Sequence, residues 1–202
     1  MSTNLHINSD YIIILEMQRK SFGKMQCPVA RSLERVGEWW SILIIRDALH
    51  GLTRFDQFEE SLGIAPNMLT RRLSALVKAG LLERRRYSER PPRYEYVLTE
   101  RGRDFRSVIV AFHAWGNKHY APEGASVLIV NARTGAPADP VLVDRLTGVP
   151  LVYPEYVVAP GPAARESTRR KLAASAWGGM RGGAHPASFP DKRGARRPGT
   201  RS

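Results

Sequence analysis

Four segments of the chain repeat apolar residues with a helical period, and each of them ends at a glycine. The predicted helices span residues 28–36, 38–50, 54–62 and 66–79, and the glycines that follow are Gly37, Gly51, Gly63 and Gly80. Pro28 and Pro66 suit the first turns of the first and fourth helices. Thr53, with Asp56 three residues later, predicts the N-cap of the third. The centre of the chain is therefore predicted to be mainly helical.

After Gly80 the period changes from helical to alternating. Residues 81–87 and 93–98 read as two strands, and we expect the segment 88–92, with two prolines, to form a turn and not to continue a strand. Thr99 then predicts the cap of a long helix that ends near Tyr120. Two short helices, a tight turn between them and a following hairpin predict a mainly α fold with a small β-hairpin wing, the winged helix-turn-helix.

Composition divides the chain into four parts. Residues 1–26 form an N-terminal arm or helix, 27–124 the winged helix-turn-helix domain with a C-terminal helix, 125–160 a small β-rich extension, and 161–202 a basic tail. The tail is rich in Ala, Arg, Gly and Pro and is expected to be disordered, with one segment, 165–177, of helical character. The apolar run Tyr11–Leu15 is too short to cross a bilayer, and no cleavage signal follows it, so we expect a cytoplasmic, nucleoid-associated protein.

The net charge of +12 favours a polyanionic partner but lies mostly in the tail. Residues 161–202 hold 10 Lys and Arg and 2 Asp and Glu, whereas residues 1–160 hold 21 and 17. The prediction of DNA binding therefore depends on the order of residues in the domain. No phosphate-binding loop, nucleophile elbow, carboxylate pair or metal-ligand spacing is found, so we predict neither an enzyme nor a metal or cofactor site.

The fourth predicted helix, 66–79, separates an apolar face from a polar face without acidic residues. The polar face carries Asn67, Thr70, Arg71, Ser74 and Lys78. Amides, guanidinium groups and hydroxyls are the groups that contact base edges and phosphates. We predict base contacts for the first three and phosphate contacts for Ser74, Lys78 and the neighbouring Arg72. An amphipathic helix with a solvated polar face is the alternative. The combination of a capped helix, a glycine turn, a helix begun by proline and ended by glycine, and a basic hairpin favours DNA binding.

Arginines gather on the predicted hairpin. They are Arg84, Arg85, Arg86, Arg90 and Arg93, around a tip stiffened by proline. A solvated charge run explains any single one of them, but the set suits contact with the DNA backbone or the minor groove. Arg54, at the start of the third helix, completes the predicted DNA-binding residues.

Several runs in residues 27–120 resemble the HxlR-type winged helix family of bacterial regulators. The runs are Cys27-Pro28-Val29, Gly37-Glu38-Trp39, Ile44–Leu49, Arg54–Phe58, Leu69–Leu73, Ala79–Leu82, Arg90–Tyr96, and Leu98-Thr99 with Gly102. The resemblance implies a homodimeric regulator that binds double-stranded DNA, with the first and last helices of the domain at the dimer interface. Ala65 departs from the pattern, because family members often have a serine there, which weakens the N-cap of the recognition helix.

Dimerisation also has support from the residues themselves. Phe105, Val108, Ile109, Phe112 and Trp115 form an apolar stripe on the helix after the hairpin. The alternative is that the stripe packs on its own domain. We favour a dimer that holds two recognition helices about one DNA turn, ~34–36 Å, apart.

Two features leave the question of an effector open. Cys27 directly precedes a helix, where the dipole favours a thiolate, and the family resemblance implies an oxidant sensor at this place. The alternative is a small buried packing residue. Thr-Gly pairs occupy 134–135 and 147–148, where the resemblance to longer family members implies Cys-Gly pairs, so we expect a structural flap there and no metal knuckle. The competing functions are a nonspecific nucleic-acid binder that uses the tail and a winged-helix module for protein interaction.

Overall fold

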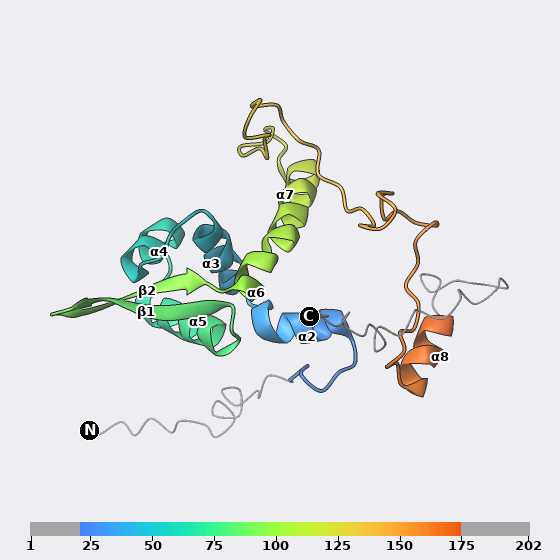
Figure 1. The fold of residues 1–202 in the computed structure, drawn as a ribbon, viewed down its shortest axis with the longest axis horizontal. Helices are drawn as coiled ribbons and strands as arrows, with labels where there is room; N and C mark the ends of the chain where they lie inside the picture. Colours follow the sequence, from blue (N-terminus) through green and yellow to red (C-terminus); the bar gives the residue numbers. More distant parts are fainter. Residues whose placement is uncertain (1–20, 175–202) are drawn as a thin grey trace, which may run out of the picture. The chain divides into compact units, whose positions relative to one another are not determined.

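The computed structural model describes residues 21–174, and the chain divides after Val141 into two compact units (Figure 1). The apolar run at 11–15, most of the predicted N-terminal arm and the tail from 175 onward lie outside the described residues. Within residues 21–174, no helix combines the length and apolar character needed to cross a membrane.

The four predicted helices of the first unit are confirmed. They are α2 (Pro28–Val36), α3 (Trp39–Leu49), α4 (Phe55–Leu62) and α5 (Pro66–Lys78). Gly63 ends α4 in the left-handed conformation, with φ of +58°, which a residue without a Cβ adopts at little cost. The chain thus turns sharply between α4 and α5, the two helices of the helix-turn-helix.

The core of this unit is built from side chains of α3, α4, α5 and the start of the hairpin. The fully buried large residues are Ile44, Ile45, Phe58, Leu69, Leu73, Leu76 and Leu82. Three of them lie on α5 at positions 69, 73 and 76, one face of a helix with 3.6 residues per turn. The core therefore fixes which face of α5 points outward.

The prediction that Thr53 and Asp56 cap α4 is wrong. Arg54 occupies the N-cap, and the side-chain amide oxygen of Gln57 accepts hydrogen bonds from the backbone N–H groups of Thr53 and Arg54 at 3.0 and 2.9 Å. A long amide side chain in the first turn reaches back over both orphan donors, so a hydroxyl at position 53 is not needed.

The hairpin is longer than predicted. Strand β1 spans Leu82–Glu89 and β2 spans Pro92–Leu98, antiparallel, with Leu82 opposite Leu98 and Glu89 opposite Pro92. Pairing thus continues through most of the segment expected to be a turn. The register shifts between Arg86 and Ser88, and Pro92 is tolerated because it is the first residue of an outer strand. In Figure 1 the tip of the hairpin extends past α4 and α5.

The long helix predicted after Thr99 is present as two pieces, α6 (Glu100–Asp104) and α7 (Arg106–Tyr120). Thr99 caps α6 as predicted, since its side chain accepts from the Gly102 N–H at 3.1 Å. A Cβ on Gly102 would lie 2.1 Å from the carbonyl oxygen of Leu81, so only glycine lets α6 approach the start of β1 this closely. The chain redirects at Phe105, whose side chain packs against the core.

The prediction of a β-rich segment over 125–160 is wrong, because only isolated bridges form there. Val130 pairs with Pro137 in the first unit, and Val143 pairs with Pro150 in the second. Each bridge closes a turn in which the side chain of Asn131 or Asp144 accepts from backbone N–H groups. Prolines within the segment cannot donate to a ladder, which keeps the pairing to single bridges.

The second unit contains one further helix among its described residues, α8 (Glu166–Ala174). It confirms the helical character predicted near residues 165–177, as far as the structure describes that segment. In the turn of this unit, hydrogen bonds from the Leu146 N–H and the Thr147 hydroxyl lower the pKa of Asp144.

Candidate nucleic-acid interface

Helix α5 presents the predicted polar face to solvent. Asn67, Thr70, Arg71, Ser74 and Lys78 are all exposed, while Leu69, Leu73 and Leu76 on the opposite face are buried. The N-cap is Ala65, and no side chain caps the helix. The departure noted in the sequence is therefore present in the structure: Ala65 offers no capping side chain, and the Met68 N–H donates instead to the side chain of Asn67 within the first turn.

Two of the predicted base-reading groups are engaged locally. The side-chain oxygen of Asn67 accepts from the Met68 N–H at 2.7 Å, and the Thr70 hydroxyl donates to the Pro66 carbonyl at 2.8 Å. The amide nitrogen of Asn67 and the lone pairs of Thr70 stay available. Thus the first turn offers a donor and an acceptor, but a bidentate contact from Asn67 to adenine requires its oxygen to leave Met68.

Arg71 and Lys78 carry the free positive charge of this face. Both are exposed, and neither makes a hydrogen bond or ion pair with another residue of the described part of the chain. A guanidinium group has five donors in a fixed fork, whereas an ammonium group is a point charge on a flexible stem. Arg71 is therefore the side chain of α5 best suited to read a guanine edge, and Lys78 to contact a phosphate.

Arg72 differs from these two cations, because its charge is engaged within the first unit. Its guanidinium group forms an ion pair with Glu38 at 3.0 Å and is only 17% exposed. This pair joins α5 to the N-cap residue of α3. Arg72 thus joins the recognition helix to α3, and its phosphate contact stays a prediction.

Asp47 is a structural residue that the sequence did not single out. Its carboxylate is 4% exposed, pairs with Arg46 at 2.7 Å and accepts from the Ser61 hydroxyl at 2.8 Å. It therefore joins α3 to the end of α4, just before the turn that leads to α5. The sequence signal was the Arg46-Asp47 pair inside an otherwise apolar helix.

The arginines of the hairpin are held by neighbours on the hairpin itself. The guanidinium carbon of Arg84 lies 3.6 Å from the centroid of the Tyr94 ring, a cation–π stack. Arg85 forms two hydrogen bonds with the Glu83 carboxylate at 3.0 and 3.2 Å, which lower the pKa of Glu83. Arg86 donates to the carbonyl groups of Ser88 and Glu89.

The remaining predicted contacts lie at the two ends of the hairpin. Arg90 and Arg93, at the tip, are exposed and unpaired within the described residues. Arg54 lies at the base, where it forms a bridge with Glu95 of β2 and an ion pair with Asp56 at 3.6 Å. The backbone of α4 is thus attached to the hairpin, and the predicted basic residues gather on α5, the N-terminus of α4 and the hairpin.

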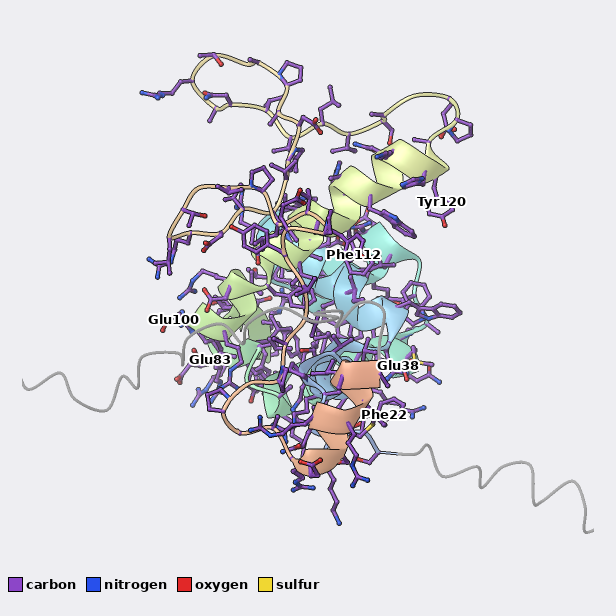
Figure 2. The ribbon with its side chains drawn as sticks, turned by 90° about the vertical axis from the view of Figure 1, so that its right-hand side faces the viewer. Phe22, Glu38, Glu83, Glu100, Phe112 and Tyr120 are labelled. Carbon is purple, nitrogen blue, oxygen red and sulfur yellow. The ribbon has the colours of Figure 1, made fainter. Side chains whose placement is uncertain are left out.

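Helix α7 buries none of its residues in the chain. Three members of the predicted stripe are exposed: Val108 by 39%, Phe112 by 50% and Trp115 by 53%. Phe105 and Ile109 are half-buried. Figure 1 shows α7 leading away from the other helices of its unit, and Figure 2 labels Phe112 and Tyr120 on it. The alternative in which the whole stripe packs on its own domain is therefore wrong.

Cys27 occupies the N-cap of α2 and carries an exposed free thiol. The alternative of a buried packing residue is therefore wrong. Residues 21–174 contain no group of three or more His, Cys, Asp and Glu side chains arranged to hold a metal ion. In the Thr-Gly turns at 134–135 and 147–148, the Thr134 hydroxyl accepts from the Ala136 N–H and the Thr147 hydroxyl donates to Asp144.

Comparisons with known proteins agree with this geometry. Residues 35–124 match the model of the HxlR-like helix-turn-helix family. The uncharacterized HTH-type transcriptional regulator Rv3095 of Mycobacterium tuberculosis is 40% identical over 148 residues, which are 73% of this chain and 91% of that protein.

Two solved structures have similar folds. PA1374 of Pseudomonas aeruginosa, assigned as a transcription factor, is 60% identical with a TM-score of 0.53, over 72% of this chain and 100% of that one. PA1607, also assigned as a transcription factor, is 37% identical with a TM-score of 0.62, over 69% of this chain and 99% of that one. The chain belongs to the HxlR-like helix-turn-helix family of transcriptional regulators.

Proposed function

We propose that this chain is a sequence-specific regulator that binds double-stranded DNA with α5 in the major groove. The observation that carries the proposal is the polar face of α5, which is exposed, free of acids and rigidly backed by three buried leucines. A recognition helix needs both properties, since the side chains must reach base edges from a fixed backbone. Family membership supports the same function.

The hairpin serves as the second contact in this proposal. Its tip carries Arg90 and Arg93, and its stem carries Arg84, Arg85 and Arg86. Cations held on a strand pair that extends past the helices suit a backbone or minor-groove contact beside the major groove. In this proposal Arg54, at the N-cap of α4, contacts a phosphate between the two.

We infer in addition that two copies of the chain associate through α7. Val108, Phe112 and Trp115 form an apolar surface on a helix without a buried residue, and surfaces of this kind mark interaction sites. A twofold dimer pairs the same patch on both copies and doubles the DNA contact. The two recognition helices then read half-sites about one helical turn apart, ~34–36 Å.

The DNA proposal is tested by selecting bound fragments from the source genome and then measuring affinity for the selected duplex and a scrambled one. We expect a clear preference that remains when residues 161–202 are deleted, while the salt dependence of binding becomes shallower. Equal affinity for both duplexes after the deletion would instead favour a nonspecific binder that uses the tail. Absence of duplex binding at low salt would favour a protein-interaction module.

The dimer proposal is tested by sedimentation of the full chain and of Phe112→Asp. A charge in the centre of an apolar interface is expected to weaken self-association by about 2–4 kcal/mol. Leu146→Asp is the control, because Leu146 is 85% exposed and lies outside α7. A wild-type chain that sediments as a monomer at micromolar concentration would contradict the proposal.

Cys27 stays a predicted oxidant sensor. Its exposed thiol at the N-cap of α2 supports access by an oxidant. We expect oxidant treatment to lower DNA affinity in the wild type and to leave Cys27→Ser unchanged. Full retention of the oxidant effect in Cys27→Ser would remove this role.

A further inference from the structure

A hollow of about 360 Å³ lies in the first unit. It is bounded by α2, by the chain between α5 and β1, and by α6 with the start of α7. Its apolar floor includes Val36 and Leu81, which are buried, and Phe105, which is half-buried. The volume lies near the lower end of the range for small-molecule sites, roughly 300–1,000 Å³.

Three arginines surround this floor. Arg31 and Arg35 extend from α2 and Arg101 from α6, and the only acid in the lining is Asp104. Arg35 is exposed and has no hydrogen-bond or ion-pair partner among residues 21–174. The lining therefore combines a net positive charge with an apolar surface.

Two of these arginines are held in place by backbone carbonyls. The Arg31 Nε donates to the Met25 carbonyl at 2.6 Å, and an Arg101 terminal nitrogen donates to the Ala79 carbonyl at 3.1 Å. Each guanidinium group has five donors, so most of them remain for a ligand. Pre-positioned guanidinium groups recognise carboxylates and sulfonates through strong charge-assisted hydrogen bonds.

We propose that this pocket binds a small organic acid with an apolar, ring-sized body and one carboxylate or sulfonate group. The body lies on Val36, Leu81 and Phe105, and the acid group pairs with Arg35 and Arg101. An inorganic anion would gain nothing from the apolar floor, and a neutral ligand would leave the positive charges of the rim without a counter-charge. An amphipathic monoanion meets both surfaces.

The pocket is connected to the recognition helix through Arg101. Ala79 is the C-cap residue of α5, and the Thr99 hydroxyl donates to the neighbouring Gly80 carbonyl at 2.7 Å. A ligand anion that pairs with Arg101 competes with the Ala79 carbonyl for the same guanidinium group, which changes how the end of α5 is held where it passes into β1. Binding of the acid thus changes the affinity for DNA, and this part rests on the proposed function.

The pocket borders the apolar stripe of α7. Phe105 and Val108 belong to both, whereas Phe112 and Trp115 lie one and two turns further along the helix. A second copy of the chain is therefore the competing occupant. The two occupants differ in chemistry, because a ligand anion depends on the charge of the rim and an apolar helix does not.

The test uses the full chain and two fluorescent probes of similar shape, the anion 8-anilinonaphthalene-1-sulfonate and the neutral N-phenyl-1-naphthylamine. We expect saturable binding of the anionic probe, about tenfold weaker in Arg35→Gln and a few-fold tighter in Asp104→Asn. Arg169→Gln on α8 is the matched control and leaves the affinity unchanged. The neutral probe does not respond to either change of charge.

Two further variants identify the place of binding. Ser32→Trp puts a large side chain from α2 into the pocket and abolishes binding of both probes. Phe112→Ser changes the exposed stripe but not the pocket, so the affinity is retained. Loss of binding in Phe112→Ser with no response to Arg35→Gln would place the probe on α7 and overturn the proposal. Binding that declines as the protein concentration rises would assign the pocket to a second copy.

The probe titration needs no DNA, so it remains informative if the proposed function fails. With DNA, the anionic probe is expected to shift the affinity for the selected duplex, and the duplex to shift the probe affinity by the same factor. Arg101→Gln removes this coupling. If binding of the anionic probe depends on the charge of the pocket but leaves the DNA affinity unchanged, the regulatory part of the proposal is refuted.

Discussion

Helix α5 and the β1–β2 hairpin both carry exposed cations, but they hold them differently. On α5, Arg71 and Lys78 are unpaired within the described residues, and the helix beneath them is anchored by buried leucines. On the hairpin, Arg84, Arg85 and Arg86 each have a partner on the hairpin itself. On α5 the core fixes the helix, and the two cations have no partners within the described residues. On the hairpin stem the three arginines already have partners.

This difference implies different roles at a DNA duplex. A free guanidinium group on a rigid helix can adopt the one geometry that a base edge demands, which gives sequence discrimination. Side chains already ordered by stacking and pairing lose less conformational entropy on binding, but they must exchange partners to contact a phosphate. We therefore expect α5 to determine sequence preference and the hairpin to adjust affinity and salt dependence.

The largest expected effect tests α5 through Arg71→Ala. Loss of a bidentate contact to a guanine is expected to weaken the selected duplex by about 1–3 kcal/mol and to affect a scrambled duplex much less. Fluorescence anisotropy with both duplexes measures this, and Arg133→Ala, an exposed arginine in the first unit, is the control. An equal loss of affinity for both duplexes would mean that Arg71 contacts a phosphate, and α5 and the hairpin would then not differ in role.

Arg72→Met sharpens the comparison inside α5 itself. Because Arg72 pairs with Glu38 while Arg71 is free, the variant is expected to lower the free energy of unfolding by about 1–2 kcal/mol and to keep the salt slope of DNA binding. Thermal unfolding of Arg72→Met, Glu38→Gln and the double variant gives the coupling energy. A shallower salt slope with unchanged stability would return Arg72 to the DNA surface.

The difference between Arg71 and Arg72 also shows how far the sequence pattern can predict the roles of single side chains. Periodicity correctly predicted α5, its buried stripe and its exposed face, because three leucines at helical spacing leave one orientation for a helix on a core. Arg72 lies at the border of that stripe, where the pattern does not decide. Its assignment depended on Glu38, 34 residues earlier in the chain, and only the packing of α3 against α5 brings the two together.

Similar limits apply to the hairpin and the extension. The alternation predicted two strands, but the pairing through Ser88 and Pro92 depends on a bulge that local patterns do not reveal. Over 125–160, Val-rich composition predicted strands, yet strands need pairing partners, and the structure offers single bridges. The long helix predicted after Thr99 breaks at Phe105, whose side chain packs against the core, and such a tertiary contact is not visible in the local pattern. The arginine pocket has no sequence signature either, because its cations come from two distant helices.

The ordering of the hairpin arginines is tested by Tyr94→Leu. Removing the ring under Arg84 takes away a cation–π contact worth roughly 0.5–1 kcal/mol at an exposed site. We expect DNA affinity to fall two- to fivefold on the selected and the scrambled duplex alike (about 1.4 kcal/mol being tenfold). Tyr87→Leu, on the same hairpin but outside the stack, serves as the control. An unchanged affinity would show that the stack does not pre-position Arg84 for DNA.

The smallest effect concerns Glu83, which neutralises Arg85 on the free hairpin. Glu83→Gln removes the ion pair, so one more guanidinium group is available to a phosphate, and the slope of log affinity against log salt is expected to steepen by about 1. The affinity for the selected duplex and for the scrambled duplex should rise by the same factor. A gain confined to the selected duplex would give the hairpin a share in sequence readout.

The pH dependence of DNA affinity is a second test of the Glu83–Arg85 ion pair. Arg85 lowers the pKa of Glu83, so the carboxylate is still more than half ionised at its ordinary pKa and reaches half-protonation only at a lower pH. The stabilisation from the pair is therefore present at neutral pH and is lost as the pH falls through the lowered value. Between pH 6 and 8, DNA affinity should show no contribution from Glu83 titration, and the wild-type and Glu83→Gln profiles should run parallel. Profiles that converge within this range would mean that Glu83 is protonated near neutral pH, which the Arg85 pair opposes.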